Sequence, residues 1–226
     1  MSEERPQIIA QRRFLEHKED LERLDLKGRF EYIFDTNLWG DDASRSGVGS
    51  TLPETETLRC EIPRLLQDLD ARSLLDIPCG DFGWLSLTEL GVDYTGADIV
   101  EALVAQNTRR YASEKRRFVR LDLTADPLPQ ADVVLCRDCL VHLSYANIQR
   151  ALDNVKRSGA KYLLVTSFPA AKSNRDIEDG DWRLLNFQLA PFSFPPPART
   201  IVENCIEADG AYRDKSLCLW PVAELA

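Results

Sequence analysis

The stretch that most constrains this chain is 72–84, which has the sequence R-S-L-L-D-I-P-C-G-D-F-G-W. Residues 73–77 form a short apolar run that is typical of a buried strand and contains one acid, Asp76. A turn that includes Gly80 follows, and apolar residues then recur at near-helical spacing over 82–90. We therefore expect a strand, a tight turn and a helix. In open α/β sheets such a junction places a ligand at the carboxyl end of the strand.

This stretch resembles motif I of the class I S-adenosylmethionine-dependent methyltransferases. The family pattern is an acid followed by three alternating glycines. Asp76 takes the acid position and Gly80 the middle glycine, whereas Pro78 and Phe82 replace the outer two. Glycine suits this turn because a backbone that approaches a ligand closely has no room for a Cβ atom. The resemblance implies that four residues of the turn bind S-adenosylmethionine: Asp76, Cys79, Gly80 and Asp81.

A dinucleotide-binding fold is the neighbouring interpretation of the same turn, and it would make the protein an NAD-dependent oxidoreductase. A pyrophosphate needs free amides at a helix N-terminus and little negative charge beside them. Asp76 and Asp81 flank the turn, which suits the ammonium of a methionine group better. An ordinary strand–turn–helix junction without a ligand is the plainer alternative.

The composition describes a globular chain with one sizeable domain. Its 226 residues and 44% hydrophobic content suffice for an α/β core with appendages. A net charge of −9 and a pI of about 4.9 argue against nonspecific nucleic-acid binding, which depends on Lys and Arg. No run approaches the ~18 apolar residues of a membrane span, and the first residues lack the apolar core of a signal peptide. We therefore expect a cytoplasmic protein whose six scattered cysteines are reduced.

Predicted strands alternate with predicted helices over 72–168, which favours a mainly parallel sheet. Two further strand-like runs, 198–206 and 215–222, would close it as an antiparallel pair. The order resembles the seven-stranded methyltransferase sheet. We expect an α/β fold with a Rossmann-like seven-stranded, mostly parallel sheet, a C-terminal antiparallel strand pair, helices on both faces and an N-terminal helical cap. The predicted division is a helical arm and lid at 1–50 and a methyltransferase domain at 51–226.

A second acid, Asp98, is expected at the end of the second strand, 22 residues after Asp76. In nucleoside-binding α/β folds an acid at this distance accepts hydrogen bonds from the ribose hydroxyls, since a carboxylate has two oxygens and no donor. An exposed strand-end aspartate is the alternative. The methyltransferase resemblance further implies that Asp122 binds the adenine amine and that the Leu123 amide meets a ring nitrogen. The predicted cofactor set also includes Ile99 and Arg137.

The charged N-terminal residues 1–28 carry interleaved apolar positions, which predicts one or two amphipathic helices ended by Gly28. They would form a cap or a dimerisation arm, so a monomer and a homodimer both stay open. Residues 30–50 begin aromatic and end in S-R-S-G-V-G-S, whose hydroxyls and free amides suit a carboxylate. We expect a lid here, with a plain connecting loop as the alternative. The predicted cofactor contacts are Gly47, Gly49 and Ser50, and the predicted substrate contacts are Tyr32 and Trp39.

The fourth strand-like run, 131–136, is followed by R-D-C-L-V-H-L-S. In the resembling family this strand end faces the transferred methyl group. His142 is therefore the predicted general base, because an imidazole with a pKa of about 6.5 can accept a hydroxyl proton at neutral pH. Asp138 would orient that imidazole or bind a substrate hydroxyl. A core or helix-capping histidine is the structural alternative.

Cys136-x-x-Cys139, with His142 three residues further on, also permits a zinc or thiol-redox site. A structural zinc needs four ligands and no second C-x-x-C motif occurs, so we predict no metal at these cysteines. A divalent cation such as Mg²⁺ beside the cofactor is left open. Its candidate ligands are Asp138, Asp176, Asp179 and Asp181.

The segment 169–197 is predicted to be long and irregular, and connections of this length are uncommon unless they are functional. Its acids, amides and aromatic rings suit a polyhydroxylated ligand, since rings cover the apolar side of a sugar and amides bind its hydroxyls. Within it, 195–197 is a proline run that suits a rigid turn or a ligand for a proline-recognition domain. The predicted substrate contacts are Asn174, Trp182 and Arg183.

Together these features predict an O-methyltransferase that uses S-adenosylmethionine to methylate a hydroxyl of a small polar acceptor, a sugar or saccharide. The enzyme must align acceptor, methyl group and sulfur, and must remove the acceptor's proton. Methylation of another natural product at oxygen or nitrogen is the alternative. So is a non-catalytic cofactor-binding or assembly protein, because fold does not fix function. Neither a nucleic acid nor a membrane is an expected partner.

Overall fold

A computed structural model of this chain describes residues 5–39 and 44–225. Its helices are α1 (Ile9–Glu16), α2 (Lys18–Leu21), α3 (Leu26–Asp35), α4 (Glu56–Asp68), α5 (Glu101–Tyr111), α6 (Tyr145–Arg157) and α7 (Glu207–Gly210). Its strands are β1 (Ser73–Asp76), β2 (Asp93–Asp98), β3 (Arg116–Arg120), β4 (Val133–Cys136), β5 (Tyr162–Ser167), β6 (Arg199–Val202) and β7 (Ser216–Pro221).

These strands form one seven-stranded sheet in the order β3-β2-β1-β4-β5-β7-β6. The first five strands are parallel to one another, and β7 runs antiparallel to both β5 and β6. The predicted fold class, a mostly parallel sheet with a C-terminal antiparallel pair, is confirmed. The strand order reverses between β1 and β4, which is where ligands bind in open α/β sheets.

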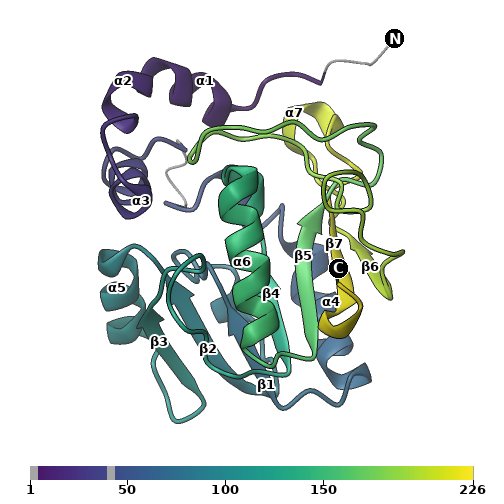
Figure 1. Ribbon diagram of the computed structural model, residues 1–226. Coiled ribbons are helices and arrows are strands. Elements are labelled where there is room, and N and C mark those ends of the chain that lie inside the picture. The colour runs from purple at the N-terminus through teal and green to yellow at the C-terminus, as the bar shows by residue number, and fades with distance from the viewer. Residues whose placement is uncertain (1–4, 40–43, 226) are drawn as a thin grey trace.

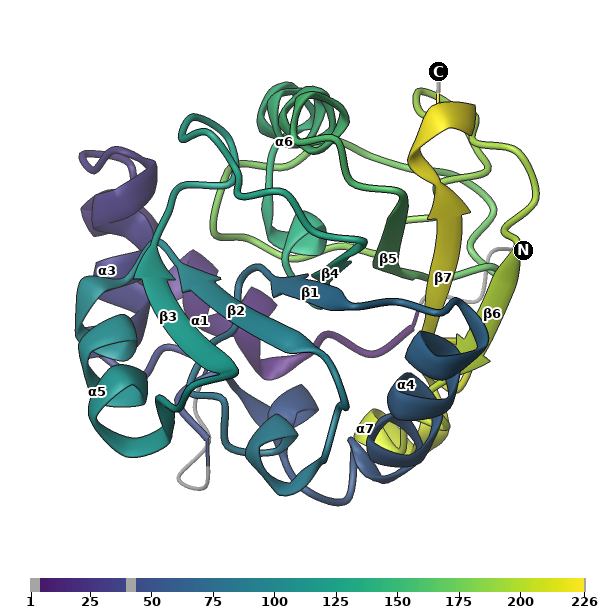
Figure 2. The same cartoon turned by 90° about the horizontal axis from the view of Figure 1, so that it is seen from below.

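The sheet lies between two apolar layers because its central strands are buried on both faces. Leu75 and Val134 face the core that α6 covers, whereas their neighbours Leu74 and Val133 face the core that α4 and α5 cover. Figure 2 shows α6 on one face of the sheet and α4 and α5 on the other. The two-residue alternation along each strand is therefore what divides the core into two layers.

The first three helices form the predicted N-terminal cap. Figure 1 shows α1, α2 and α3 beyond the carboxyl ends of β1 to β5. The prediction that Gly28 ends a helix is wrong, since it lies in the first turn of α3. There its N–H donates to Oδ1 of the N-cap residue Asp25 at 2.8 Å. Residues 40–43 of the predicted lid and 1–4 of the predicted arm lie outside the described residues. The division of the chain at residue 50 stays a prediction.

The helix predicted over 82–90 is also wrong, because only the 3₁₀ turn Leu85–Leu87 forms there. Phe82 has a left-handed backbone, with φ of 56°, which prevents a helix from starting at this position. Its ring instead packs against Tyr94 and Phe118, with centroid separations of 4.9 and 5.1 Å. The apolar spacing in this stretch therefore reflects burial against the sheet.

The long segment 169–197 contains neither helix nor strand, as predicted, yet backbone hydrogen bonds tie it to the rest of the domain. The Gly180 N–H donates to the His142 carbonyl at 2.8 Å, and the Arg183 N–H donates to the Val141 carbonyl at 3.1 Å. The segment is thus fastened to the turn that carries His142.

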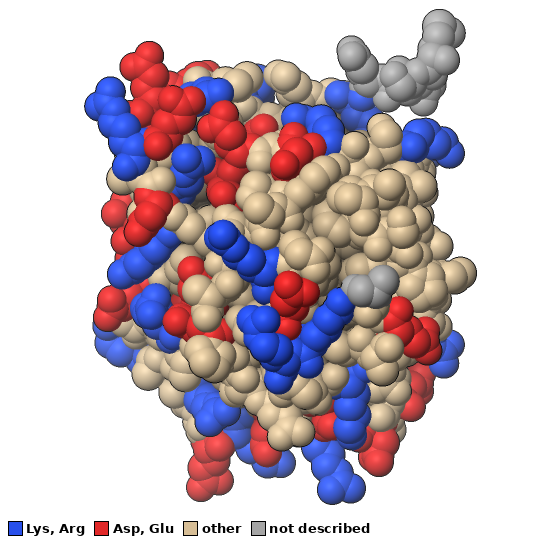
Figure 3. All heavy atoms as spheres, viewed as in Figure 1, with Lys and Arg blue, Asp and Glu red and all other residues tan. Residues whose placement is uncertain are grey.

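Charges of both signs are spread over the face seen in Figure 3, where a broad uncharged area lies on the side of β6. The chain has no charged residue over 184–198. No helix within the described parts of the chain is both long and apolar enough to cross a membrane.

Candidate active site

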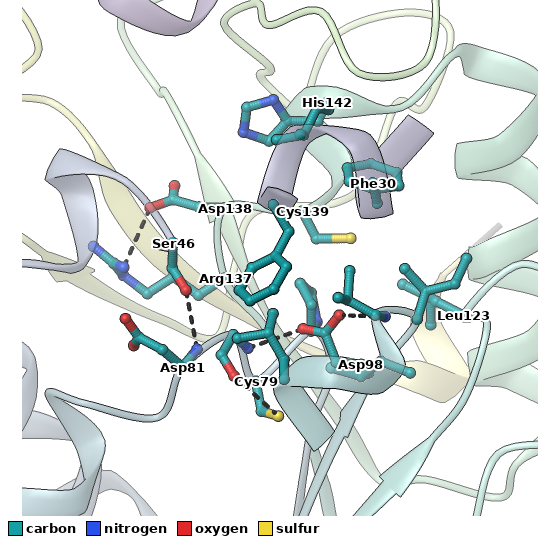
Figure 4. A pocket seen from close by; sticks show the side chains of 18 of the residues that line it. Phe30, Ser46, Cys79, Asp81, Asp98, Leu123, Arg137, Asp138, Cys139 and His142 are labelled. Carbon is teal, nitrogen blue, oxygen red and sulfur yellow. Dashed lines mark hydrogen bonds and ion pairs between the residues drawn. The ribbon is translucent and has the colours of Figure 1, made fainter. Parts of the chain in front are cut away.

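A large cavity lies at the carboxyl ends of β1, β2 and β4, between the sheet and α3. About 1040 Å³ of empty space lies between its lining residues, and this figure includes open solvent. Leu26 and Phe30 of α3 line it on the side of the cap. The predicted cofactor residues from four segments also line it: Asp76, Cys79, Gly80, Asp81, Asp98, Ile99, Asp122, Leu123 and Arg137. Figure 4 shows Asp81, Asp98 and Asp138 around this cavity, with His142 at the end away from Asp98.

The motif I turn is held by two buried side chains. Gly80, with φ of 54°, donates its N–H to Asp98 Oδ2 at 3.0 Å. Its carbonyl accepts from Asn107 Nδ2 at 2.7 Å, and Asn107 is fully buried on α5. Asn107 was not predicted, because nothing in the helical pattern of α5 distinguishes a buried amide that reaches another segment.

Asp76 and Asp98 are both buried carboxylates at strand ends, and each keeps capacity to accept more hydrogen bonds. Asp76 Oδ2 accepts from the Tyr94 hydroxyl at 2.6 Å, and Asp98 Oδ1 accepts from the Val100 N–H at 2.9 Å. Burial raises the pKa of Asp76 to about 7 and the pKa of Asp98 to about 6. Both acids therefore favour a ligand that supplies donors or positive charge, as the ribose hydroxyls and the ammonium of S-adenosylmethionine do.

Residues 44–50 pack directly on the motif I turn. Ser46 Oγ accepts from the Asp81 N–H at 3.0 Å, and the Ser44 hydroxyl donates to Asp81 Oδ2 at 2.7 Å. A Cβ atom on Gly80 would collide with the Ser46 hydroxyl, so the glycine makes room for this segment. Of the predicted contacts here, Ser50 lines the cofactor cavity, whereas Gly47 and Gly49 line a neighbouring one.

The prediction that the backbone N–H groups of residues 44–50 are free to bind a carboxylate is wrong for three of them. Ser46 N–H donates to Ser44 Oγ, Gly47 N–H to the Ser44 carbonyl and Ser50 N–H to the Gly47 carbonyl, at 3.0 to 3.1 Å. These amides are used within the segment, since a tight turn satisfies its own backbone. Any contact that the segment makes with a carboxylate must therefore come from other groups.

Two acids and two bases form a buried ionic cluster beyond the end of β4. Arg137 donates to Glu203 Oε2 at 2.7 Å and to the Gly49 carbonyl at 2.7 Å, and it lies 3.2 Å from Asp138 Oδ2. Lys215 Nζ lies 2.6 Å from the same Asp138 oxygen. Arg137 lines the cavity as predicted, but its N–H groups are engaged in this cluster rather than free for the cofactor. Glu203 and Lys215 were not predicted, because Glu203 lies 66 residues from its partner Arg137 and Lys215 lies 77 residues from its partner Asp138.

His142 lies on the 3₁₀ turn Leu140–His142 and is buried. Its Nδ1 is 2.8 Å from the Asp181 carbonyl, and a carbonyl can only accept, so Nδ1 carries the proton and Nε2 has a lone pair. The ring stacks on Trp39, with centroids 4.7 Å apart. Burial lowers the pKa of His142 to about 4, so the imidazole is neutral at physiological pH.

The predicted role of Asp138 in orienting His142 is wrong, because the Asp181 carbonyl does this instead. Burial alone would raise the pKa of Asp138, but Lys215 and Arg137 outweigh it and bring the pKa below its ordinary value. Asp138 is thus an ionised carboxylate already paired with two cations. One further role, accepting a hydrogen bond from a substrate hydroxyl, stays a prediction.

A second cavity of about 630 Å³ adjoins the first. Trp39, Ser46, Asp138 and His142 line both cavities and form the boundary between them. Trp182, a predicted substrate contact, lines the second cavity only. The arrangement provides two adjacent binding spaces with His142 between them, as a transfer between two bound molecules requires.

Three predicted substrate contacts line neither cavity. The Tyr32 hydroxyl bonds His17 and Asp20 within the cap. Asn174 Nδ2 donates to the Asn186 and Ala190 carbonyls, each at 2.9 Å. The fully buried Arg183 donates to the carbonyls of Leu140 and Leu143 at 2.7 and 2.6 Å. Asn174 and Arg183 thus satisfy backbone carbonyls, and Tyr32 bonds side chains of the cap, roles that sequence alone does not distinguish from ligand binding.

The acids considered as metal ligands make separate contacts elsewhere in the structure. Asp176 and Asp179 accept from the backbone N–H groups of Tyr145 and Ser144, at 2.7 Å each, and so hold the start of α6. Among residues 5–39 and 44–225, no group of three or more His, Cys, Asp or Glu side chains is arranged to hold a metal ion.

The comparisons with known proteins agree with this geometry. A family model described as a methyltransferase domain matches residues 75–160. No curated protein matches the sequence. The fold is similar to N-methyltransferase NodS from Bradyrhizobium japonicum WM9, solved with S-adenosyl-L-homocysteine, at 15% identity and a TM-score of 0.49, over 60% of this chain and 71% of that one.

Two further solved structures are similar in fold. One is a TehB-like S-adenosylmethionine-dependent methyltransferase from Corynebacterium glutamicum, at 16% identity and a TM-score of 0.48, over 70% of this chain and 85% of that one. The other is the methyltransferase domain of bacterial CtHen1-CN, at 15% identity and a TM-score of 0.45. The match to the latter covers 50% of this chain and 66% of that domain.

The family match and the strand order confirm the resemblance inferred from motif I. The chain has the fold of the class I S-adenosylmethionine-dependent methyltransferases, and residues 75–160 match a methyltransferase-domain family model.

Proposed function

We propose that this protein transfers a methyl group from S-adenosylmethionine to a hydroxyl of a small polar acceptor, a sugar or saccharide. Asp76 and Asp98 would hold the methionine ammonium and the ribose of the cofactor, and Asp122 and Leu123 its adenine. Bound there, the cofactor supplies an electrophilic methyl group on sulfur. Everything else in the reaction depends on how the chain holds the acceptor and removes its proton.

The proposal rests mainly on the protonation and the position of His142. Its Nδ1–H is donated to the Asp181 carbonyl, so the unprotonated Nε2 is the ring nitrogen that remains for a ligand. The residue lines both cavities. An acceptor hydroxyl in the second cavity can donate to Nε2 and direct its oxygen lone pair toward the first cavity.

A pKa of about 4 makes His142 a weaker base than the sequence predicted. This suffices for methyl transfer to oxygen, because the hydroxyl becomes strongly acidic as its oxygen bonds to the methyl group. Proton transfer to a weak base is then downhill late in the step. The low pKa also keeps the imidazole free of protons over the whole physiological range.

His142→Gln tests this role, since the amide keeps a polar side chain of similar size but cannot accept the proton. We expect kcat for methyl transfer to fall ~10²- to 10⁴-fold, with the affinity for S-adenosylhomocysteine unchanged. Rates would be measured with radiolabelled S-adenosylmethionine and a saccharide acceptor, and affinity by calorimetry. Wild-type kcat in this variant would contradict the base assignment. In the wild-type enzyme kcat should stay level down to about pH 5, because His142 protonates only near pH 4.

A non-catalytic cofactor-binding protein and an acceptor nitrogen are the remaining alternatives. The first predicts S-adenosylhomocysteine binding without turnover for any acceptor. The second predicts transfer to amines, which the nearby Lys215 ammonium opposes unless the amine arrives uncharged.

A further inference from the structure

The second cavity adjoins the one proposed for the cofactor, and its lining has a distinct chemistry. It extends from the boundary residues Trp39 and His142 toward α7 and the start of α1. Ile8 and Ile9 close it on the side of the cap, and Glu207 lines it at α7. The cavity thus combines apolar walls with a few polar groups, the usual composition of a small-molecule site.

The charges around this cavity disfavour an anionic ligand. Lys215 lines it, but its ammonium already contacts Asp138 at 2.6 Å and Glu203 at 3.6 Å. Asp138 is likewise shared between Lys215 and Arg137. An anionic ligand would therefore find no free cation among these residues and would meet the carboxylate of Glu207 as a like charge. A neutral ligand avoids this penalty.

Glu207 is an acceptor in this cavity whose carboxylate has no hydrogen-bonding partner among the described residues. Its carboxylate makes no hydrogen bond or ion pair with any other described residue. A carboxylate with both oxygens free can accept from two neighbouring hydroxyls at once, and it has no donor to leave unsatisfied.

The remaining walls are aromatic. Phe168, Trp182 and Tyr212 pack edge-to-face, with centroid separations of 5.4 to 6.3 Å, and all three line the cavity. Trp39 lines it next to His142, and its buried indole N–H has no hydrogen-bond partner in the described chain. The cavity therefore offers free acceptors at Glu207 and His142 Nε2, and ring faces for C–H groups.

We propose that this second cavity binds the acceptor as a neutral polyhydroxylated ring, and that Glu207 fixes its orientation by accepting hydrogen bonds from two of its hydroxyls. The inference rests on the proposed methyl transfer, because only then does a second ligand lie beside the cofactor. Free acceptors suit hydroxyls, since each hydroxyl can donate a hydrogen bond. The aromatic walls suit the C–H face of a pyranose ring.

The test uses the full chain saturated with S-adenosylhomocysteine and matched hexose probes. D-glucose, D-galactose and D-mannose are the neutral probes, and D-glucuronate is the anionic one. Saturation-transfer NMR detects binding, and titration gives each dissociation constant. We expect at least one neutral hexose to bind, and to bind about tenfold more tightly than the anionic probe. We expect Glu207→Gln to weaken that binding about tenfold, with unchanged affinity for S-adenosylhomocysteine.

Asp209→Asn is the matched control, because it removes the same charge from an exposed position of α7. It should leave hexose binding unchanged. The proposal is overturned if no neutral hexose binds, if D-glucuronate binds as tightly, or if Glu207→Gln binds hexose like the wild type. Failure of S-adenosylhomocysteine to bind at the outset would instead refute the proposed function itself.

Discussion

At the scale of single residues, two buried carboxylates should make cofactor affinity depend on pH. Burial raises the pKa of Asp76 to about 7 and that of Asp98 to about 6, so in the free protein both gain protons as the pH falls through this range. An ammonium or hydroxyl donor binds the ionised form, so binding must compete with protonation. The same shifts mean that the folded, ligand-free protein holds these protons more tightly than the unfolded chain. This contribution to stability is therefore present at low pH and is lost as the pH rises toward 7.

We predict that the affinity for S-adenosylhomocysteine is at least about tenfold lower at pH 5 than at pH 7, because Asp98 alone is then mostly protonated. Calorimetric titration across this range measures the effect. Tyr94→Phe removes the hydroxyl that donates to Asp76 Oδ2, so it should move the transition to higher pH. An affinity that stays level from pH 5 to pH 8 would show that neither carboxylate contacts the ligand.

The acids of the cofactor site could be predicted from sequence, whereas their environment could not. Asp76, Asp98 and Asp122 each follow a strand-like run, and the ends of parallel strands meet at one edge of a sheet. The chain folds accordingly. The low pKa of His142 and the pairing of Asp138 with Lys215 depend on residues far away in the sequence. No local pattern reports such contacts.

At the scale of elements, residues 44–50 depend on a glycine that no other residue replaces without strain. Gly47 has φ of 88° and ψ of 175°, a region that is essentially restricted to glycine. A Cβ atom there would also lie 3.2 Å from Trp39 Cβ. Because Ser46 holds the motif I turn, distortion at Gly47 is transmitted to the cofactor site.

Gly47→Ala should lower the free energy of unfolding by ~1–3 kcal/mol and weaken S-adenosylhomocysteine binding several-fold. Chemical denaturation and calorimetry measure the two effects. Gly91→Ala is the control, because Gly91 also has positive φ, at 71°, but nothing lies within 4 Å of its added Cβ atom. It should destabilise the fold and leave binding intact. Wild-type affinity in Gly47→Ala would mean that residues 44–50 do not support the cofactor site.

Arg183 connects the segment 169–197 to the turn that carries His142. Its guanidinium donates to the carbonyls of Leu140 and Leu143, and burial lowers its pKa to about 10. Lysine cannot reproduce this planar fork, so Arg183→Lys leaves a buried carbonyl without its donor.

We predict that Arg183→Lys lowers the free energy of unfolding by ~2–4 kcal/mol. It should also reduce kcat, with little effect on S-adenosylhomocysteine affinity, because His142 shifts while the cofactor site stays in place. Arg150→Lys, on the exposed side of α6, should change neither quantity. A stability equal to that of the wild type would contradict the structural role of Arg183.

Element prediction succeeded where burial and periodicity agree and failed where a local backbone feature intervened. The short apolar runs of β1 and β4 and the helical pattern of α6 were enough to predict these elements. Residues 82–90 show helical spacing too, but the left-handed backbone of Phe82 prevents a helix. The irregular segment 169–197 was recognised as long, yet its polar residues Asn174 and Arg183 bind backbone carbonyls rather than line a cavity.

At the scale of the whole molecule, the N-terminal cap and the sheet together define two adjoining cavities. α3 closes the cofactor cavity, and the start of α1 closes the second one. An ion pair at 2.5 Å between Arg5 and Asp214 ties the start of the chain to the turn before β7. The cap therefore belongs to both proposed binding sites.

The central claim is that the cavity at the ends of β1 and β2 binds S-adenosylmethionine and not a dinucleotide. Isothermal titration calorimetry of the full chain with S-adenosylhomocysteine, and in parallel with NAD, tests it most directly. We predict binding of S-adenosylhomocysteine alone, in the micromolar range, and its loss in Asp98→Ala, with circular dichroism to verify that this variant is folded. Binding of NAD, or no binding of S-adenosylhomocysteine by the folded wild type, would contradict the account.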